Sequence, residues 1–396
     1  MTIDYYNYYE FKPGGYPVKH RRKEPFIPMI NVGTAYRDRI NEIRRFDFEF
    51  DRFILSADDY GKLIEDAYAS NVHWSTKLEG NPLTEQETAK ITSDTFSGTL
   101  IRERPFGPFQ EIVNHLIHGI FPEISSFPWT HEKIEFLNFI LLWNTGANTK
   151  MGEYRKNHCS VKTSTGMEIF IPAPPEHVRE EMGFLLDWVN HQAPAYDPIA
   201  GATVFFHEFE SVHPFEDGNG RTGRSLFHLL LQELGLRNSN LCKIDCYILK
   251  DSELYYQLLA YADYTGSYAE LIDFFSYSIL KSYEDAQKRL SQMDLINSGL
   301  DEISLRILRK SKERQKWFTL KEATEWVGEV GDQTVRSRLN ELVEMSVLER
   351  IGQTRATRYR LRDPLDEIRR EVLEIAYENS PEELMEKIKG ITPYRE

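Results

Sequence analysis

Apolar residues recur every three or four positions along most of the chain, which is the spacing that one buried face of an α-helix requires. Around Phe53 to Leu78, for example, Leu63, Ile64 and Tyr68 repeat at core spacing, and Gly80 followed by Pro82 marks a helix end. The same pattern returns in residues 109–117 and 134–142 and continues from Val178 through Leu234, where Gly235 is a plausible stop. We therefore expect a mainly α-helical chain.

Two stretches depart from the helical pattern. Val161 to Ile171 resembles two short strands about a Thr165–Gly166 turn, and the four residues after it are Pro-Ala-Pro-Pro. The first fifty residues are rich in Tyr and Pro and have few periodic signals, so residues 1–58 are expected to form an extended arm across the surface. The short basic patch at 19–24 within this arm is expected to be solvated.

The C-terminal part differs in charge as well as in pattern. From Leu300 to Arg362 there are 14 Lys and Arg against 10 Asp and Glu, a net charge of +4; since the whole chain carries −14, the other 333 residues carry −18. Helix, turn, helix and two strands follow one another here, with Thr319 placed to cap a helix, and this order resembles a winged helix over residues 300–362. Residues 363–396 are expected to form one or two further helices.

In the DNA-binding relatives of such a winged helix, the second helix and the wing meet bases and phosphates. The residues that would do so here are Gln333, Thr334, Arg336, Arg338, Arg355 and Arg358. Interspersed acids leave a second interpretation open, in which the winged helix serves dimerisation or is a rigid appendage.

Composition places the chain among packed globular proteins. Of its 396 residues 41% are apolar and 13% aromatic, and no stretch approaches twenty uninterrupted apolar residues. The first residues lack a signal-peptide core, and three cysteines form neither an even framework nor a zinc spacing. We expect a cytoplasmic protein without a membrane partner, and the net charge argues against indiscriminate nucleic-acid binding by the whole chain.

The candidate chemistry is concentrated in the twelve residues from His213 to Arg224, His-Pro-Phe-Glu-Asp-Gly-Asn-Gly-Arg-Thr-Gly-Arg. A histidine followed by proline ends one helix, and the Gly218-Asn219-Gly220 turn starts the next, so that unpaired amides and the helix dipole form an anion site.

Charged and titratable residues complete this candidate site. Arg221 and Arg224 lie one turn apart on the second helix and stay charged at physiological pH. Asp217 is suited to a divalent cation against phosphate oxygens, and His213 is a base that titrates near neutrality. The combination indicates phosphoryl or nucleotidyl transfer, whereas a solvated helix–turn–helix is the structural alternative.

The same twelve residues resemble the Fic (filamentation induced by cAMP) motif, His-x-Phe-x-Asp/Glu-Gly-Asn-Gly-Arg-x-x-Arg, at every defining position. The resemblance extends over residues 59–285 and implies a helical Fic domain with one small β-hairpin flap that docks the target segment. It further implies ATP and Mg²⁺ at the site, with His213 as base and Asp217 at the metal. Arg221 and Arg224 would clamp the β- and γ-phosphates, and Phe215 would anchor the loop.

A second resemblance concerns the end of the helix near residues 60–80. Ser75-x-x-x-Glu79-Gly80 is similar to the inhibitory motif Ser/Thr-x-x-x-Glu-Gly/Asn of many Fic proteins, in the class whose inhibitory helix precedes the core. The resemblance implies that Glu79 pairs with Arg224 and keeps the triphosphate of ATP out of position. The alternative is that Glu79 faces solvent.

The resulting hypothesis is an autoinhibited protein adenylyltransferase that moves AMP from ATP to a Ser, Thr or Tyr hydroxyl of an unknown target protein. Three alternatives stay open: transfer of another nucleotide or phosphate group, removal of AMP, and a nucleotide-sensing winged-helix regulator that binds DNA. A homodimer also stays open. His207 is expected to be a core or interface histidine rather than a catalytic one. Tyr255 and Tyr256 are expected to be aromatic core residues, and the alternative is that one of them flanks an adenine.

Overall fold

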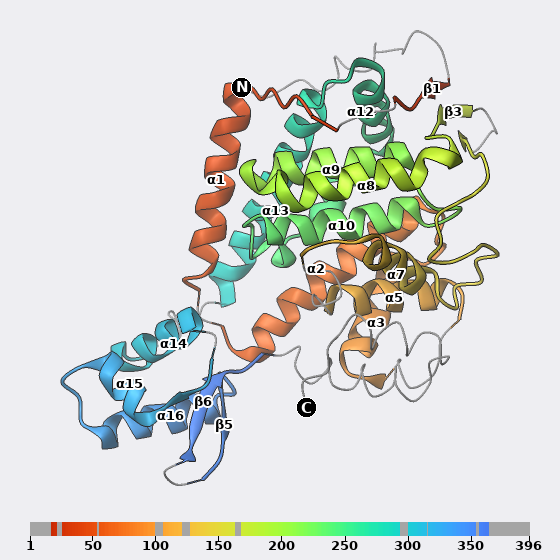
Figure 1. The fold of residues 1–396 in the computed structure, drawn as a ribbon. Helices are drawn as coiled ribbons and strands as arrows, with labels where there is room; N and C mark the ends of the chain where they lie inside the picture. The colour runs from red at the N-terminus through yellow and green to blue at the C-terminus, as the bar shows by residue number, and fades with distance from the viewer. Residues whose placement is uncertain are drawn as a thin grey trace.

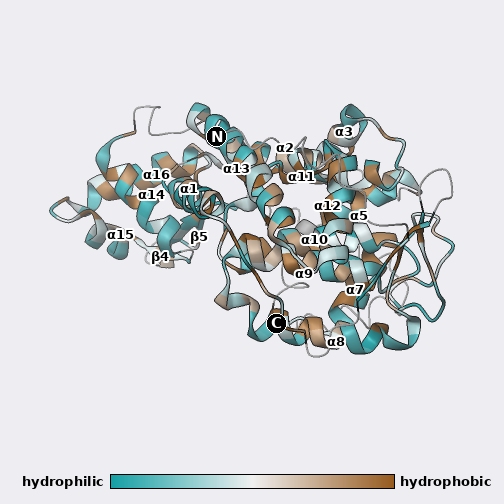
Figure 2. Cartoon of the chain, turned by 90° about the horizontal axis from the view of Figure 1, so that it is seen from above, coloured by the Kyte–Doolittle hydropathy of each residue, from teal (hydrophilic) through white to brown (hydrophobic). Residues whose placement is uncertain are grey.

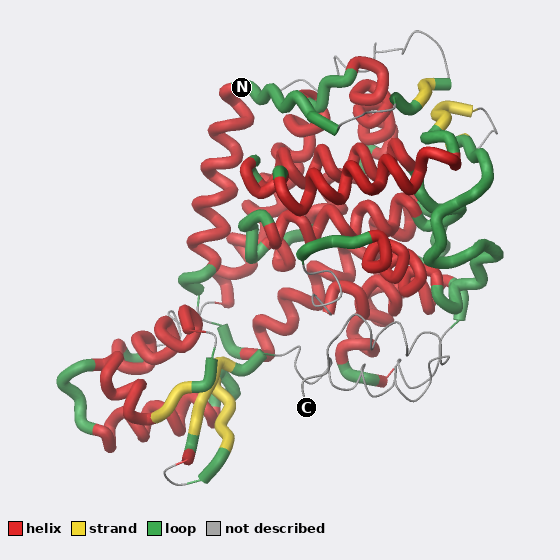
Figure 3. Tube along the Cα trace, in the orientation of Figure 1, coloured by secondary structure: helices red, strands yellow, loops and turns green. Residues whose placement is uncertain are grey.

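The computed structural model describes residues 17–21, 26–53, 55–99, 106–120, 127–162, 168–293, 300–314, 316–353 and 356–363. Helices dominate it, and strands are few and short (Figure 3). The prediction of a mainly helical chain is therefore confirmed. The Thr165–Gly166 turn, Arg355 and the tail after residue 363 lie outside the described residues, so the predictions made for them stay predictions.

The larger unit is helical (Figure 1). Its helices before the flap are α1 (Thr34–Phe50), α2 (Ala57–Leu78), α3 (Glu85–Phe96), α5 (Pro108–Ile120) and α7 (His131–Leu142). Those after the flap are α8 (Pro175–His191), α9 (Pro198–Val212), α10 (Asn219–Glu233), α11 (Ile244–Leu249), α12 (Ser252–Thr265) and α13 (Ala269–Met293). Short 3₁₀ turns occupy η2 (Ala193–Ala195) and η3 (Ser239–Leu241).

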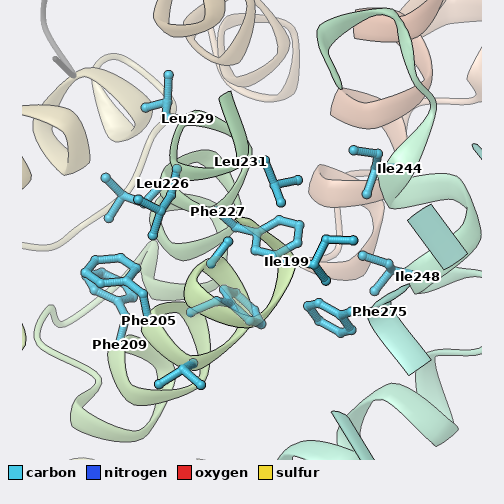
Figure 4. Close-up of a cluster of buried hydrophobic side chains, with 14 of the residues drawn as sticks. Ile199, Phe205, Phe209, Leu226, Phe227, Leu229, Leu231, Ile244, Ile248 and Phe275 are labelled. Carbon is cyan, nitrogen blue, oxygen red and sulfur yellow. The ribbon is translucent and has the colours of Figure 1, made fainter. Parts of the chain in front are cut away.

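Helix α9 is the centre of this unit, because every residue from Pro198 to Phe209 is buried. Such an all-round apolar helix is stable only when other helices surround it, and α8, α10 and α13 pack against it. Figure 4 shows the aromatic and aliphatic side chains that α9 and α10 bring together, and Figure 2 shows hydrophobic segments on these same two helices. The core thereby fixes the two helices that flank the loop 213–218.

The prediction of an extended arm over residues 1–58 is wrong for residues 34–50, which form α1. The helix buries Tyr36, Ile40, Ile43, Phe46 and Phe50, a spacing of three or four that belongs to one helix face. This face packs against α13, and the stacked rings of Phe50 and Tyr283 are part of the contact. The opposite face is rich in Arg and Glu, so the composition of the segment does not indicate a helix with a buried face.

The flap, residues 161–171, belongs to a three-stranded sheet rather than standing as a hairpin alone. Strands β2 (Val161–Lys162) and β3 (Glu168–Ile171) are antiparallel, as predicted, with Val161 opposite Phe170. The unpredicted strand β1 (Val18–Lys19) adds to the other edge of β3 in parallel, with Val18 opposite Phe170. The next residue, His20, is buried between Glu181 and Ser211 and anchors β1 to the helices below.

The C-terminal unit has its own core and lies beside the lower end of α1 (Figure 1). It contains α14 (Glu302–Arg314), α15 (Leu320–Val327) and α16 (Asp332–Glu344), with a sheet in the order β4 (Phe318–Thr319), β6 (Arg358–Leu361), β5 (Leu348–Ile351). Thr319 caps α15 as predicted, through a reciprocal capping box with Glu322. Lys312 donates hydrogen bonds to the carbonyls of Phe50 and Phe53 and thereby joins the unit to α1. Its identification as a winged helix stays a prediction.

Candidate active site

The candidate site is the loop between α9 and α10, where one helix ends and the next begins. His213 caps α9 in the left-handed conformation, with φ of 53° and ψ of 61°, and Gly218 starts α10 with φ of 79°. A left-handed histidine costs energy, of the order of 1–3 kcal/mol, and such conformations cluster at functional sites. Glycine accepts the second left-handed position without that cost.

The loop is held from inside by Asn219. The side-chain oxygen of Asn219 accepts from the Phe215 amide at 2.8 Å, and its side-chain nitrogen donates to the Phe215 carbonyl at 2.9 Å. Phe215 is 1% exposed and packs on Tyr154 and Phe209, which agrees with its predicted role as an anchor. The Asn219 side chain is thus occupied within the loop, so its contribution to an anion site is its backbone amide.

The amides of the α10 first turn face the anion site. The first bond within the helix runs from Thr222 to the Gly218 carbonyl, so the amides of Asn219, Gly220 and Arg221 have no acceptor inside the helix. A side chain on Gly220 would collide with Glu79 and Arg224, because the Glu79 carboxylate lies directly over this glycine. The chain therefore places a carboxylate of its own where a helix N-terminus binds anions.

The predicted pairing of Glu79 with Arg224 is present in the structure. Glu79 Oε1 lies 2.7 Å from Arg224 Nη2, while Arg224 Nε donates to the Ser75 hydroxyl at 2.8 Å and Nη2 donates to the Ser75 carbonyl at 2.9 Å. Burial alone would raise the pKa of Glu79, but the charge and hydrogen bond of Arg224, together with the charges of Arg221 and His213, lower it. Gly80 follows with φ of 94°, which ends the helix as predicted.

A second acid, Glu111 on α5, holds the other arginine. Arg221 Nη1 lies 2.6 Å from Glu111 Oε1 and Nη2 lies 2.6 Å from Asp217 Oδ1. The other Glu111 oxygen accepts from the Asn81 side chain at 2.7 Å. Asn81 directly follows the Glu79–Gly80 turn, so this turn reaches Arg224 directly and Arg221 through Glu111.

Asp217 is the candidate metal carboxylate. Its side chain is 40% exposed, and Oδ1 accepts from Arg221 and from the Gly218 amide. Among the residues described, no three His, Cys, Asp or Glu side chains lie close enough to hold a metal ion by themselves. A divalent cation here would depend on Asp217 together with the oxygens of a bound phosphate.

His213 is a neutral imidazole at physiological pH. Burial, and next the charge of Arg155, lower its pKa to about 4, although Glu79 and Asp217 act in the opposite direction. A hydrogen bond with the Glu210 backbone also raises the pKa, but by less than burial lowers it. An unprotonated histidine can accept a proton, which is the state that a general base needs.

Sequence reasoning did not find three residues that position the site. Glu111 contacts Arg221 as described above. Asn138 on α7 is fully buried; it donates to the Asp217 carbonyl at 3.0 Å and accepts from the Gly152 amide at 3.0 Å. Arg155 donates to the His213 carbonyl at 2.7 Å. The buried amide of Asn138 on an apolar helix face was the clearest available signal, because such a group needs hydrogen-bond partners.

The residues expected to be structural lie in the core. His207 is 1% exposed; burial lowers its pKa, but Asp263 and Glu208 outweigh this and raise it to about 9. Tyr255 is 2% exposed and packs on Phe206 and Phe275. Tyr256 is 42% exposed, so the prediction of a core position is wrong for it.

In the C-terminal unit, Arg338 is engaged with acids. Arg338 Nε lies 2.6 Å from Asp301 and Nη1 lies 2.8 Å from Glu341. Both contacts are local to the unit, so they do not distinguish DNA contact from a structural role. DNA contact and dimerisation stay predictions. In the described part of the chain, no helix combines the length and the hydrophobicity needed to span a bilayer.

Comparison with known proteins identifies a Fic domain within the chain. The model of the Fic/DOC family matches residues 128–231, which include the loop and both flanking helices. The chain is 27% identical over 180 residues to protein adenylyltransferase fic-1 of Caenorhabditis briggsae, covering 44% of this chain and 34% of that protein. It is 35% identical over 97 residues to a probable protein adenylyltransferase of Aquifex aeolicus, covering 24% and 28% of the two chains.

The matches to these two curated relatives thus cover about a third of their length. Among solved structures, a Fic family protein of Desulfovibrio desulfuricans shares the fold with a TM-score of 0.56 at 19% identity, covering 85% of this chain and 98% of that one. The motif, the family model and the shared fold agree, and residues 128–231 of this chain form a Fic domain of the Fic/DOC family.

Proposed function

We propose that the chain is a protein adenylyltransferase, which transfers AMP from ATP to a Ser, Thr or Tyr hydroxyl of a target protein. The observation that carries this proposal is the anion site at the start of α10, with two arginines beside it and a neutral histidine at the opposite end of the loop. The names of the relatives, protein adenylyltransferases, support the same chemistry.

At the α-phosphorus of ATP, the proposed reaction forms one bond and breaks one, and one proton moves. The target hydroxyl oxygen attacks the α-phosphorus of ATP, its proton passes to His213, and the bond from the α-phosphorus to the bridging oxygen breaks, so that pyrophosphate leaves. The amides of Asn219 and Gly220 and the two arginines stabilise the negative charge, which is usually the largest contribution to such catalysis, whereas the Gly218 amide donates to Asp217. Asp217 would hold Mg²⁺, which neutralises charge on the phosphates.

We further propose that Glu79 inhibits this reaction. Its carboxylate takes the place of an anion over Gly220 and satisfies the Arg224 guanidinium together with Ser75. A triphosphate that enters this site meets a like charge and a guanidinium that is already engaged. The γ-phosphate then lacks its clamp and the α-phosphorus is out of line for attack.

The test is incorporation of α-phosphorus label from ATP into the enzyme itself and into lysate proteins. Three proteins are compared: wild type, Glu79→Gly, and Glu79→Gly combined with His213→Ala. We expect strong labelling by Glu79→Gly, weak labelling by wild type, and none by the double variant. Equal labelling by wild type and Glu79→Gly would contradict the inhibitory role of Glu79.

A parallel reaction with γ-labelled ATP distinguishes AMP transfer from phosphate transfer. No label from either ATP, with ATP still bound, would overturn the transferase proposal. Release of AMP from a previously labelled target would then favour the AMP-removing alternative.

A further inference from the structure

Arg155 is a buried cation in the segment between α7 and the flap. Arg155 is 3% exposed, and among the described residues the hydrogen bonds of its guanidinium all go to backbone carbonyls. Burying a guanidinium without a counter-charge is costly unless hydrogen bonds satisfy it. Arg155 meets this requirement entirely with backbone carbonyls.

One group of these carbonyls belongs to the end of α9. Arg155 Nε donates to the His213 carbonyl at 2.7 Å, and Nη2 donates to the Val212 carbonyl at 3.1 Å. The Arg155 amide also donates to the Pro214 carbonyl at 2.8 Å. The last carbonyls of a helix lack partners within the helix and carry the negative end of its dipole, which a cation stabilises. Arg155 thereby holds His213 in its left-handed conformation.

The other carbonyls lie at the two ends of the flap. Nη1 donates to the carbonyl of Asn157, which precedes β2, at 3.0 Å, and Nη2 donates to the carbonyl of Ala173, which follows β3. A single planar guanidinium therefore contacts the chain before the flap, the chain after the flap, and the histidine at the site. Because the guanidinium is rigid, these three segments are fixed relative to one another.

We propose that Arg155 is a positioning residue for the transfer reaction, which sets the flap at a fixed place relative to His213. This inference rests on the proposed function, in which the flap presents the target hydroxyl and His213 takes its proton. Displacement of reacting groups by about 1 Å costs on the order of 10²-fold in rate. The Arg155 guanidinium positions the flap, which presents the target, and His213, which is the base. The triphosphate would be held at the opposite end of the loop.

The experiment uses the full chain with Glu79→Gly, so that transfer is measurable, and adds Arg155→Lys or Arg155→Met. Lysine keeps the charge but cannot donate to four carbonyls of three segments at once, and methionine removes both charge and donors. Arg179→Met is the matched control, since Arg179 lies at the surface with its side chain 62% exposed. Thermal unfolding confirms that each variant is folded, and Arg155→Lys carries the test if Arg155→Met is not.

The expected result is a fall in kcat on the order of 10²-fold in Arg155→Lys with KM for ATP unchanged. Transfer is followed with α-labelled ATP into the enzyme itself. An unchanged kcat in Arg155→Lys overturns the proposal. A KM for ATP that rises by the same factor as kcat falls also overturns it, because the substitution would then have disturbed ATP binding as well as the position of the flap and His213.

The imidazole of His213 gives a readout that does not need activity. Arg155, Glu79 and Asp217 are the charged groups that act on it, and the Arg155 charge lowers its pKa. Proton NMR titration of His213 should show a higher pKa in Arg155→Met than in its parent, and no change in Arg155→Lys. The amides of Phe170 and Ile171 should exchange faster in both variants, because the flap ends are released.

These measurements separate the two proposals. If the Glu79→Gly parent transfers nothing, the proposed function fails, and faster flap exchange in Arg155→Lys still supports the positioning role. If the parent transfers AMP and neither kcat nor flap exchange changes in Arg155→Lys, the positioning role fails while the proposed function stands.

Discussion

The two ends of the site loop are held by opposite charges. At the end of α9, carbonyls that have no partner within the helix accept hydrogen bonds from the buried cation Arg155. At the start of α10, amides without an acceptor in the helix and two arginines face the carboxylates of Glu79, Glu111 and Asp217. Both arrangements agree with the direction of the helix dipoles. The two ends differ in whether a substrate would have to displace the charged residue. In the proposed reaction no phosphate binds where Arg155 lies, whereas the Glu79 carboxylate lies where a phosphate would bind.

On the proposed function, the base is assembled and the phosphate site is closed. His213 is already neutral and fixed, so we infer that regulation acts on binding rather than on proton transfer. The following predictions test this division, beginning with the largest expected effect.

Removal of the base should abolish transfer without affecting the phosphate end. In the Glu79→Gly background, His213→Ala should reduce AMP transfer by about 10²–10⁴-fold, because that is the usual contribution of a general base. Binding of Mg·ATP, followed by calorimetry, should stay unchanged. His191→Ala, on a surface histidine with a 71% exposed side chain, is the control. Loss of ATP binding in His213→Ala would show that the two ends are not separate.

Glu79→Gly should tighten the binding of Mg·ATP and at the same time lower the free energy of unfolding of the protein without nucleotide. Glu79→Gly removes the carboxylate that pairs with Arg224, so the free energy of unfolding without nucleotide should fall by about 1–3 kcal/mol. Mg·ATP should bind more tightly, by about tenfold or more, and should raise Tm again by mass action. Calorimetry and thermal melts measure both.

Glu79→Gln separates charge from shape in the same experiment. If Glu79 acts by its charge, the glutamine variant should gain most of the ATP affinity that the glycine variant gains. A glutamine variant that binds ATP as weakly as wild type would show that steric blocking alone closes the site.

Loss of the contact from Asn81 through Glu111 to Arg221 should increase AMP transfer by less than the loss of Glu79 does. Asn81→Ala removes the hydrogen bond to Glu111 without touching either arginine. We expect a gain in labelling of a few-fold, which corresponds to a bond worth about 0.5–1.5 kcal/mol, and no further gain on top of Glu79→Gly. Asn340→Ala in the C-terminal unit is the control. Additive gains would mean that Asn81 acts independently of Glu79.

The pH dependence should be the weakest effect. Since the pKa of His213 is lowered to about 4, transfer by Glu79→Gly should show no loss from this histidine between pH 8 and pH 5. The unfolded chain binds a proton at this histidine near pH 6.5 and the folded chain does not, so the histidine lowers stability as pH falls from about 6.5 to about 4. His213→Ala should therefore lose less stability than its parent over this window, as followed by Tm.

Much of the site could be predicted because its chemistry is contiguous in sequence. The residues from His213 to Arg224 form one loop with two helix ends, and Gly218 takes the left-handed conformation that the turn requires. The contact of Glu79 with Arg224 spans 145 residues and was expected from the resemblance of its own short motif, since spacing along the chain cannot show it.

The missed residues have no such local signature. Glu111 lies on an amphipathic helix, where an acid normally faces solvent, and its pairing with Arg221 appears only once α5 packs against α10. Arg155 bonds backbone carbonyls, which no sequence pattern reveals. Helix α1, in contrast, has apolar residues at helical spacing from Tyr36 to Phe50. The prediction of an extended arm missed this pattern because it rested on the Tyr and Pro content of the segment. Strand β1 has two residues and depends wholly on β3 for its partner.

The burial of Ser75 and Thr76 limits how the contact between Glu79 and Arg224 can open. These residues are 3% and 1% exposed, and α2 packs against α3, α5 and α11, so the helix cannot withdraw as a rigid body without uncovering the core. Only the turn after Thr76 is free to unwind, at the expense of the bonds that Glu79, Gly80 and Asn81 donate to Thr76 and Lys77. Local unfolding of this kind takes microseconds to seconds. On the proposed inhibition, closure of the site is then an equilibrium occupancy, which a binder of the unwound turn would lower as its concentration rises above its Kd.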